Sequence, residues 1–215
     1  GNLIAIATRL QILSLNNCNL YKRDWWTHIG RALKSNPTLQ ELRIRGNNFG
    51  KLGCKDLAVG FSSNTNLKKL DISGNKLGVL GGAYLGTMIE NNSGLQVLNA
   101  YGNFMEIEGT IKVIQSLVSN TSLTDLDIGL NRMKTRGAQC LIDTLSTGKV
   151  SLLKLRVKSN HIREKSALDL SKAVRKSQLQ FLALAGNRLS ASARTEIALT
   201  LSASDEDLNP IGFDL

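Results

Sequence analysis

Residues 67–77 read LKKLDISGNKL, and the spacing of the apolar residues and the asparagine in this stretch decides the fold. The same pattern, Leu-x-x-Leu-x-Leu-x-x-Asn-x-Leu, recurs along the chain, with first leucines separated by 29, 28, 28, 28, 29 and 27 residues. Seven copies begin at Leu10, Leu39, Leu67, Leu95, Leu123, Leu152 and Leu179. A period this regular indicates one structural unit stacked repeatedly along an elongated molecule.

Each copy predicts a strand followed by a helix. Apolar residues at the fourth and sixth positions alternate with other residues, as in a strand with one buried face. Later in the copy, apolar residues follow a glycine at intervals of four, as in Gly81, Leu85 and Ile89, which is typical of a helix with one buried stripe. Parallel strands stack about 4.8 Å apart, whereas packed helices need about 8–10 Å, so the stack must curve. We therefore expect an α/β right-handed solenoid, a horseshoe with a parallel β-sheet on the concave face and α-helices on the convex face.

The repeats predict a single domain over residues 1–215. Residues 3–6 align with the last helical turn of a preceding unit, so we expect the chain to be a fragment of a longer protein. A partial eighth strand is predicted within 208–215, with apolar positions at Leu208, Ile211 and Phe213 and with Pro210 suited to an outer edge. In the first unit, Asp24 is expected to cap the helix, and one of Trp25 and Trp26 to be buried.

Six copies place an asparagine at the ninth position, where the strand turns away from the sheet. Backbone groups in such a turn need hydrogen-bond partners, and stacked amide side chains can supply them. We interpret this column as structural: Asn47, Asn75, Asn103, Asn131, Asn160 and Asn187, with Cys18 in the first copy. Asn120-Thr121-Ser122 matches a glycosylation sequon, but we favour its interpretation as a helix-to-strand turn.

These repeats resemble the leucine-rich repeat family, specifically the long-repeat class typified by ribonuclease inhibitor, and the resemblance covers essentially the whole chain. The same class is found in Ran GTPase-activating proteins, in the sensor ends of NOD-like receptors, and in tropomodulin-like and axonemal proteins. The resemblance implies a non-enzymatic scaffold that binds a protein partner. Its alternatives are a small-GTPase regulator, a cytoskeletal or axonemal component, and a ligand-sensing domain. Neither Arg9 nor Arg23 can be aligned with the functional arginine of the Ran GTPase-activating proteins.

The sequence carries no pattern for a catalytic or metal site. Cys18, Cys54 and Cys140 lie in separate repeats, and the isolated His28 and His161 lack the neighbours that a metal or a catalytic triad requires. We expect no disulfides, no cofactor and no enzymatic activity. The absence of cysteine-rich caps favours an intracellular, cytoplasmic protein, and the resemblance adds the cytoskeleton or a cilium as alternatives. No apolar run approaches the roughly 20 residues that span a bilayer, and we expect a monomer.

The concave face is where we expect a partner to bind. Alternation points the third, fifth and seventh positions of each copy into the concavity. Opposite charges there predict four ion pairs between adjacent strands: Glu41 with Lys69, Arg43 with Asp71, Asp125 with Lys154, and Asp127 with Arg156. Tyr101 is then flanked by unpaired Arg45 and Lys158, and Tyr and Arg are enriched at binding hot spots. Leu130 replaces a glycine found in four other copies, and the predicted contact set is Arg45, Val97, Tyr101, Leu130, Lys158 and Phe181.

The chain is basic, with 27 Lys+Arg against 17 Asp+Glu and a net charge of +10. Its densest basic stretch forms a predicted basic patch in the sixth unit: Arg163, Lys165, Lys172, Arg175 and Lys176. Such a run is either a solvated helix face or a contact for nucleic acid, anionic lipid or an acidic protein tail. No aromatic residue lies between Phe104 and Phe181 to stack on bases, so we favour an acidic protein surface over nucleic acid.

Overall fold

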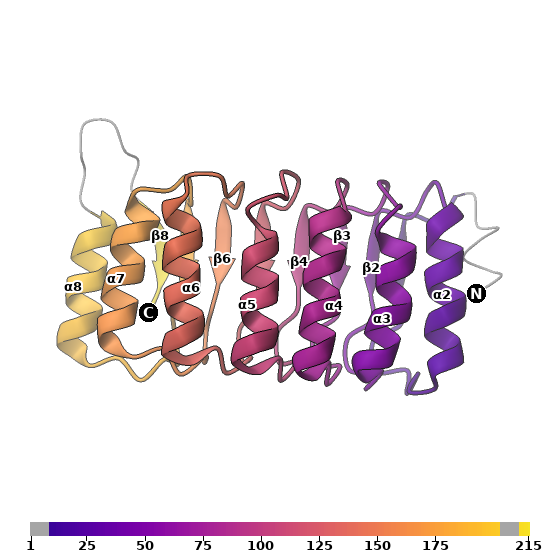
Figure 1. The fold of residues 1–215 in the computed structure, drawn as a ribbon, viewed down its shortest axis with the longest axis horizontal. Coiled ribbons are helices and arrows are strands. Elements are labelled where there is room, and N and C mark those ends of the chain that lie inside the picture. Colours follow the sequence, from indigo (N-terminus) through magenta and orange to yellow (C-terminus); the bar gives the residue numbers. More distant parts are fainter. Residues whose placement is uncertain (1–8, 203–210) are drawn as a thin grey trace.

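The computed structural model describes residues 9–202 and 211–215, and in it each of the seven repeats forms a strand and then a helix (Figure 1). The strands are β1 (Ile12–Ser14), β2 (Glu41–Arg43), β3 (Lys69–Asp71), β4 (Val97–Asn99), β5 (Asp125–Asp127), β6 (Lys154–Arg156), β7 (Phe181–Ala183) and β8 (Gly212–Asp214). The helices are α2 (Arg23–Ser35), α3 (Gly50–Phe61), α4 (Gly78–Asn91), α5 (Glu106–Ser116), α6 (Lys134–Ser146), α7 (Glu164–Arg175) and α8 (Ala191–Ser202).

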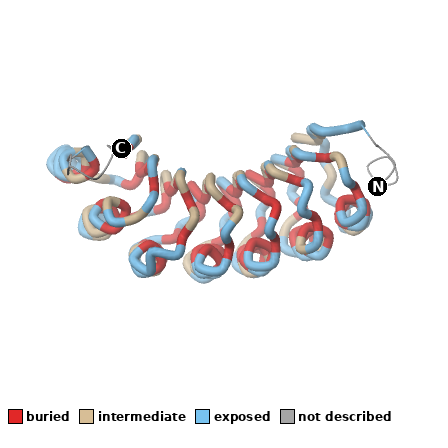
Figure 2. The backbone as a smooth tube through the Cα atoms, turned by 90° about the horizontal axis from the view of Figure 1, so that it is seen from above, coloured by how far each residue is buried: buried red, intermediate tan, exposed pale blue. Residues whose placement is uncertain are grey.

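All eight strands form one parallel sheet in chain order, which confirms the predicted solenoid. The fourth-position leucines pair with one another from strand to strand, beginning with Leu13, Leu42 and Leu70, so the repeat pattern sets the register of β1 to β7. Figure 2 shows the sheet along the inner side of an arc and the helices along its outer side. The arc follows from the unequal spacing of strands and helices.

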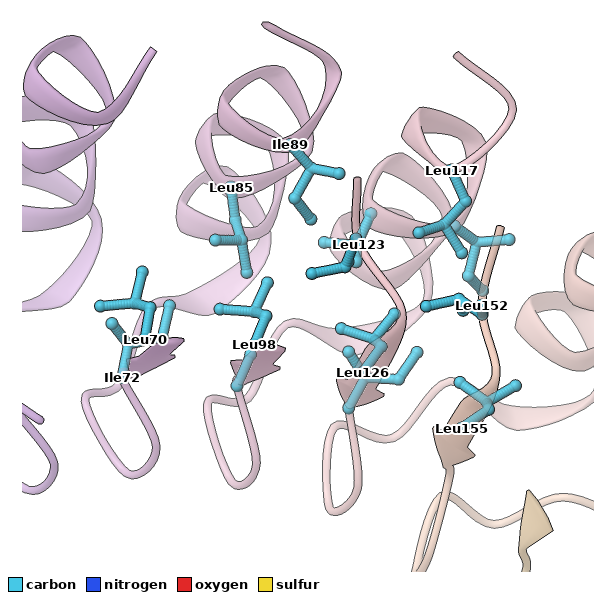
Figure 3. Packing of buried hydrophobic residues seen from close by; sticks show 14 of the residues in the cluster. Leu70, Ile72, Leu85, Ile89, Leu98, Leu117, Leu123, Leu126, Leu152 and Leu155 are labelled. Carbon is cyan, nitrogen blue, oxygen red and sulfur yellow. The ribbon is translucent and has the colours of Figure 1, made fainter. Parts of the chain in front are cut away.

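The core lies between the sheet and the helices (Figure 3). Strand leucines such as Leu98 and Leu126 and helix residues such as Leu85 and Ile89 are almost fully buried, and each stabilises the fold by about 1.5–3 kcal/mol. The first copy is less covered because it lies at the end of the described solenoid, where Leu10 is exposed. Burial is therefore continuous along the stack rather than concentrated at one centre.

The two tryptophans of the first unit divide as predicted, but the expected cap is wrong. Trp26 is fully buried, and its Nε1–H donates to the carbonyl oxygen of Leu20 at 2.7 Å, whereas Trp25 is 50% exposed. Helix α2 begins directly after Lys22, so Asp24 lies in the first turn instead of capping the helix. An acidic side chain there is still favourable because it faces the positive end of the helix dipole.

The eighth strand pairs two residues later than the repeat pattern predicts. Leu182 pairs with Phe213 instead of Ile211, and the Gly212 N–H donates to the Gln180 carbonyl oxygen at 2.9 Å. The pattern would put Pro210 at this donor position, but proline has no N–H to donate. A shift of two residues restores the bond and keeps each side chain on its original face. Residues 3–6, Leu208 and Pro210 themselves lie outside the described residues.

The predicted asparagine column forms a continuous hydrogen-bonded ladder. Asn103 is typical: its Oδ1 accepts the Asn75 N–H at 2.8 Å, and its Nδ2 donates to the carbonyl oxygens of Ile72 and Ala100, both at 3.0 Å. The same pattern recurs from Asn47 to Asn187. The ladder thus links each repeat to the next through buried polar groups that are satisfied.

A second ladder, which the repeat pattern did not predict, lies at the helix-to-strand turns. Its members are buried and recur every 28 residues: Asn36, Asn64, Asn92 and Asn120. The Asn120 Nδ2 donates to the carbonyl oxygens of Ile89 and Asn92 at 2.7 and 2.8 Å, and its Oδ1 accepts backbone N–H groups from the turn. Because both amide hydrogens are used, Asn120 is a turn residue, as we favoured for the sequon.

Glycines let pairs of helices on the convex face approach closely. A Cβ added to Gly60 of α3 would lie 2.0 Å from the carbonyl oxygen of Gly30 on α2, and one added to Gly82 of α4 would lie 2.7 Å from the Cα of Gly109 on α5. Only glycine fits these contacts without movement of the backbone. The close approach brings the helix spacing nearer to the strand spacing, which lowers the local curvature.

Candidate partner-binding surface

The structure divides the predicted contact residues between the two ends of the strands. Arg45, Tyr101 and Lys158 lie two residues beyond β2, β4 and β6, whereas Val97 and Phe181 begin β4 and β7. Four residues of strand span about 13 Å at about 3.3 Å per residue, so Val97 and Tyr101 lie at opposite ends of the concave face. The six predicted residues therefore do not form one compact site.

Tyr101 and the loop residue Leu130 lie together where β4 and β5 end. The Tyr101 side chain lies over Gly129 of the next repeat, where a Cβ would come within 2.7 Å of the ring, so glycine at this position makes room for it. Leu130 lies over Gly102, whose added Cβ would be 3.7 Å from its side chain. Tyr101 is 36% exposed, and its hydroxyl makes no hydrogen bond to the residues that the structure describes.

Two bulky apolar residues near Tyr101 have a left-handed backbone. Leu130 has a φ of 52° and Phe104 a φ of 54°, a region that costs a residue other than glycine roughly 1–2 kcal/mol. Leu130 is 39% exposed and Phe104 is 42% exposed, so intramolecular burial offsets little of that cost. We call the surface formed by Tyr101, Phe104 and Leu130 the rim patch.

Phe104 was missing from the predicted contact set. It occupies a position that is polar in the other six copies, as in Lys76 and Arg132, so a comparison of this column would have found it. The Arg132 guanidinium lies 5.4 Å from the centre of its ring and also forms an ion pair with Glu106 at 2.9 Å. The Arg132 guanidinium therefore holds the Phe104 ring in place, while part of the side chain stays exposed to solvent.

The predicted ion pairs on the concave face are wrong in their partners. The register does place Glu41 beside Lys69, but Arg43 binds Glu41 on its own strand at 2.5 Å. Arg156 likewise binds Asp125 diagonally across the strands at 2.5 Å, not Asp127 beside it. A long guanidinium reaches two residues along a strand as easily as it reaches the adjacent strand, so strand neighbours alone do not determine the partner.

Lys158 is not the unpaired cation that the sequence predicted. Its Nζ forms an ion pair with the Asp214 carboxylate of β8, two strands away. The intervening strand β7 presents Ala183 and is followed by Ala185, and these small side chains let the lysine extend across. Arg45 is exposed and forms no ion pair within the part of the chain that the structure describes.

Two carboxylates lie on either side of the Tyr101 strand. Asp71 accepts the Ser73 N–H at 2.9 Å and Asp127 accepts the Gly129 N–H at 2.8 Å, and neither forms an ion pair with another described residue. Burial raises the pKa of Asp127 although the Gly129 N–H, Arg156 and Lys158 oppose the shift. Lys69 and Lys154 lie on the same face and also form no ion pair with a described residue, so the unpaired charges at the centre of the concave face are balanced, whereas the chain as a whole is basic.

Helix α7 separates the members of the predicted basic patch. Arg163 and Lys165 lie at its amino end, and Lys172, Arg175 and Lys176 lie at its carboxyl end. At about 1.5 Å per residue, the two groups are about 15 Å apart along the helix. They do not form one continuous surface.

The search for other sites can be stated only for residues 9–202 and 211–215. Within them no three His, Cys, Asp or Glu side chains are grouped to hold a metal ion. None of the helices in this part is long and apolar enough to cross a membrane. Burial raises the pKa of the Cys54 thiol to about 12, which makes it unreactive. The expectation that the protein has no enzymatic activity stays a prediction.

Comparisons with known proteins agree with this architecture. Residues 35–58, 63–86 and 119–141 match a family model described as "Leucine Rich repeat". No curated protein sequence matches the chain. With seven strand-helix repeats at intervals of 27 to 29 residues, three stretches of which match this family model, the chain is built of leucine-rich repeats.

The following three are among the solved structures that share the fold. LegL7, a leucine-rich repeat-containing protein from Legionella pneumophila, has a TM-score of 0.61 at 18% identity, covering 88% of this chain and 62% of that one. The Caenorhabditis elegans tropomodulin C-terminal domain has a TM-score of 0.54 at 14% identity, with 80% and 87% covered. The leiomodin-1 actin-binding site 2 structure has a TM-score of 0.55 at 17% identity, with 61% and 76% covered. At these identities the likeness is one of fold.

Proposed function

We propose that this protein is a scaffold that holds a protein partner on its concave face, with the rim patch as the central contact. The observation that supports this most is the pair Phe104 and Leu130, two exposed apolar residues held in an unfavourable backbone conformation in neighbouring loops. The same two loop positions are left-handed in all seven repeats, so the loop imposes this conformation, at roughly 1–2 kcal/mol for a residue other than glycine, whichever side chain is present. Burial against a partner would offset this cost, at about 1.5–3 kcal/mol per large side chain.

Arg45 extends this surface on one side, whereas Val97 and Phe181 lie at the far end of the strands. The Arg156 guanidinium covers Phe181 at 5.6 Å from the ring centre, which gives that ring an internal partner. We therefore propose Tyr101, Phe104, Leu130 and Arg45 as the primary contact, and we keep Val97 and Phe181 as predicted secondary contacts. Lys158 contributes less than predicted because Asp214 already neutralises it.

The alternatives rest on resemblance. Leiomodin-1 is described as carrying an actin-binding site, which makes a cytoskeletal partner one form of the proposed function. The small-GTPase regulator and the ligand-sensing domain stay predictions, as do the single domain, the fragment of a longer protein, the monomeric state and the cytoplasmic location. Each of the alternative functions would also require this protein to bind a partner or a ligand.

The test uses substitutions that separate binding from folding. Leu130→Gly places glycine where the backbone is left-handed, so it relieves strain and should leave the melting temperature unchanged or higher. We expect Leu130→Gly and the double variant Tyr101→Ala with Arg45→Ala to weaken binding at least about tenfold. Binding would be measured by calorimetry with the purified partner, first identified by affinity purification with the wild-type protein.

Leu52→Ala is the matched control, because Leu52 is an equally exposed leucine on the convex helix α3. It should leave affinity unchanged. If the rim variants bind as tightly as the control, the concave face is not the contact.

A further inference from the structure

The loops that join strands to helices change conformation at the sixth repeat. In the second to fifth repeats the first residue of the helix has a left-handed backbone. In the second, third and fifth repeats, the N–H of this residue donates to a carbonyl oxygen of the next repeat. Gly50 donates in this way to Asn75, and Lys134 to Asn160, both at 3.0 Å. Arg163, at the same position of the sixth repeat, has an extended backbone with φ −81° and ψ 157°. Helix α7 therefore begins one residue later in its repeat.

A different hydrogen bond joins the sixth and seventh repeats at this edge. The Ser190 N–H donates to the Glu164 side-chain Oε1 at 2.6 Å. A hollow of about 620 Å³ lies between the two loops, lined by His161, Ile162, Arg163, Glu164, Lys165, Asn187 and Arg188. The hollow thus lies where the turn type changes, and it brings together residues of two consecutive repeats.

The lining of the hollow has an uncompensated positive charge. Arg163, Lys165 and Arg188 are exposed and form no ion pair with any residue in the described part of the chain, and Glu164 is the only lining carboxylate. Three cations less one carboxylate leave a charge of +2 with histidine neutral. The Ser190 N–H also holds the pKa of Glu164 below its ordinary value, so this carboxylate is already engaged.

The fifth repeat handles the same positions differently. Arg132 takes the place of Arg188 there, and it is paired with Glu106, whereas Arg136 is paired with Glu108. The sixth and seventh repeats leave their cations free to bind a ligand. We call the surface formed by His161, Arg163, Lys165 and Arg188 the basic groove.

We infer that the basic groove binds an acidic segment of a protein partner, with at least two carboxylates that pair with Arg163 and Arg188. The guanidinium groups suit carboxylates because they can donate two parallel hydrogen bonds. The hollow is larger than one carboxylate needs, and its cations come from facing loops, which suits a chain with several acidic side chains. No Phe, Tyr or Trp among the described residues lines it, and His161 supplies its one aromatic ring, so it offers less stacking surface than the aromatic platforms that bind single-stranded nucleic acid.

This site is separate from the rim patch. It lies on the same strand-to-helix edge, one to three repeats further along the solenoid, and its recognition is electrostatic rather than apolar. The structure assigns Arg163 and Lys165 of the predicted basic patch to the groove and adds His161 and Arg188. Lys172 and Lys176, at the other end of α7, lie outside it.

The test measures the binding of fluorescein-labelled hexaglutamate by fluorescence anisotropy at low ionic strength. The groove variant carries Arg163→Gln and Arg188→Gln. The control carries Lys172→Gln and Lys176→Gln, which removes the same charge from the same region. All four residues are exposed, and both variants should melt like the wild type. We expect the groove variant to lose about tenfold in affinity and the control less than about twofold, because a contact is worth more than net charge alone.

Two outcomes overturn the proposal. Equal losses in both variants, or none in the groove variant, would show that hexaglutamate responds only to the net charge of the protein. Tighter binding of a labelled oligouridylate than of hexaglutamate, lost in the groove variant, would assign the groove to nucleic acid. The proposal does not depend on the rim patch, because Leu130→Gly should leave hexaglutamate binding unchanged.

Discussion

Replacing Asn103 by alanine should destabilise the fold by about 2–6 kcal/mol, because the side chain is fully buried and joins two repeats. Its Oδ1 is the acceptor for the Asn75 N–H, and its Nδ2 donates to Ile72 and Ala100. Alanine can replace none of these bonds. The size of the loss in stability depends on what happens to the Asn75 N–H, which loses its acceptor, and to the two carbonyl oxygens, which lose a donor.

The Asn75 N–H would be left buried with no acceptor, which costs about 1–3 kcal/mol. The two carbonyl oxygens keep a second partner, since Ile72 also accepts from the Asn75 side chain and Ala100 also accepts from Asn131. Each therefore loses one of two bonds, at about 0.5–1.5 kcal/mol. For a chain of this size such a loss lowers the melting temperature by about 10 °C, at about 2–4 °C per kcal/mol.

Urea unfolding followed by circular dichroism measures this loss. Asn99→Ala is the control, because Asn99 faces the concavity and its side chain accepts one exposed bond, from the Tyr101 N–H at 3.1 Å. The control should cost less than about 1 kcal/mol. Equal unfolding midpoints for the two variants would refute the structural role assigned to the asparagine ladder.

Two further predictions follow from buried groups. Burial raises the pKa of Asp127, so its ionised form opposes folding as the pH rises through that raised value, and Asp127→Asn should raise the urea midpoint at neutral pH. The difference should vanish below the ordinary aspartate pKa of about 3.9, and a lower midpoint for the variant at neutral pH would contradict this. Iodoacetamide should label the exposed Cys18 of the native protein but not Cys54, whose thiol has a pKa of about 12, and mass spectrometry of the two peptides distinguishes them.

The arrangement of β1 to β7 could be predicted because it depends on residues that recur at a fixed interval. A leucine at one position of each repeat is enough to align Leu13, Leu42 and the strands that follow. The second asparagine ladder was equally visible, as an interval of 28 residues between Asn64, Asn92 and Asn120. Each of these asparagines lies three residues before the first leucine of a copy, outside the pattern that defines the strand and its turn.

The details of the candidate site depend on contacts that an interval does not encode. Lys158 has a partner because the shifted eighth strand pairs Asp214 with Ala183, and the repeat interval does not encode that shift, which avoids a proline at a position that donates an N–H. The choice between Asp125 and Asp127 as the partner of Arg156 depends on side-chain reach. The left-handed backbone of Phe104 is likewise a property of the folded loop. The sequence alone shows only that Phe104 is apolar at a position where the other six copies have a polar residue.

The glycine contacts between helices have a consequence for how such a protein evolves. A larger residue at Gly60 or Gly82 would force neighbouring helices apart and open a wider angle between the strands attached to them. The Gly82 contact lies between the repeats of Arg45 and Tyr101, so a larger residue there would change their separation although neither had been replaced, whereas the Gly60 contact sets the angle between the first and second repeats. Selection can thus refit the binding face to a partner of different width through substitutions on the opposite side of the molecule, at positions that no partner contacts.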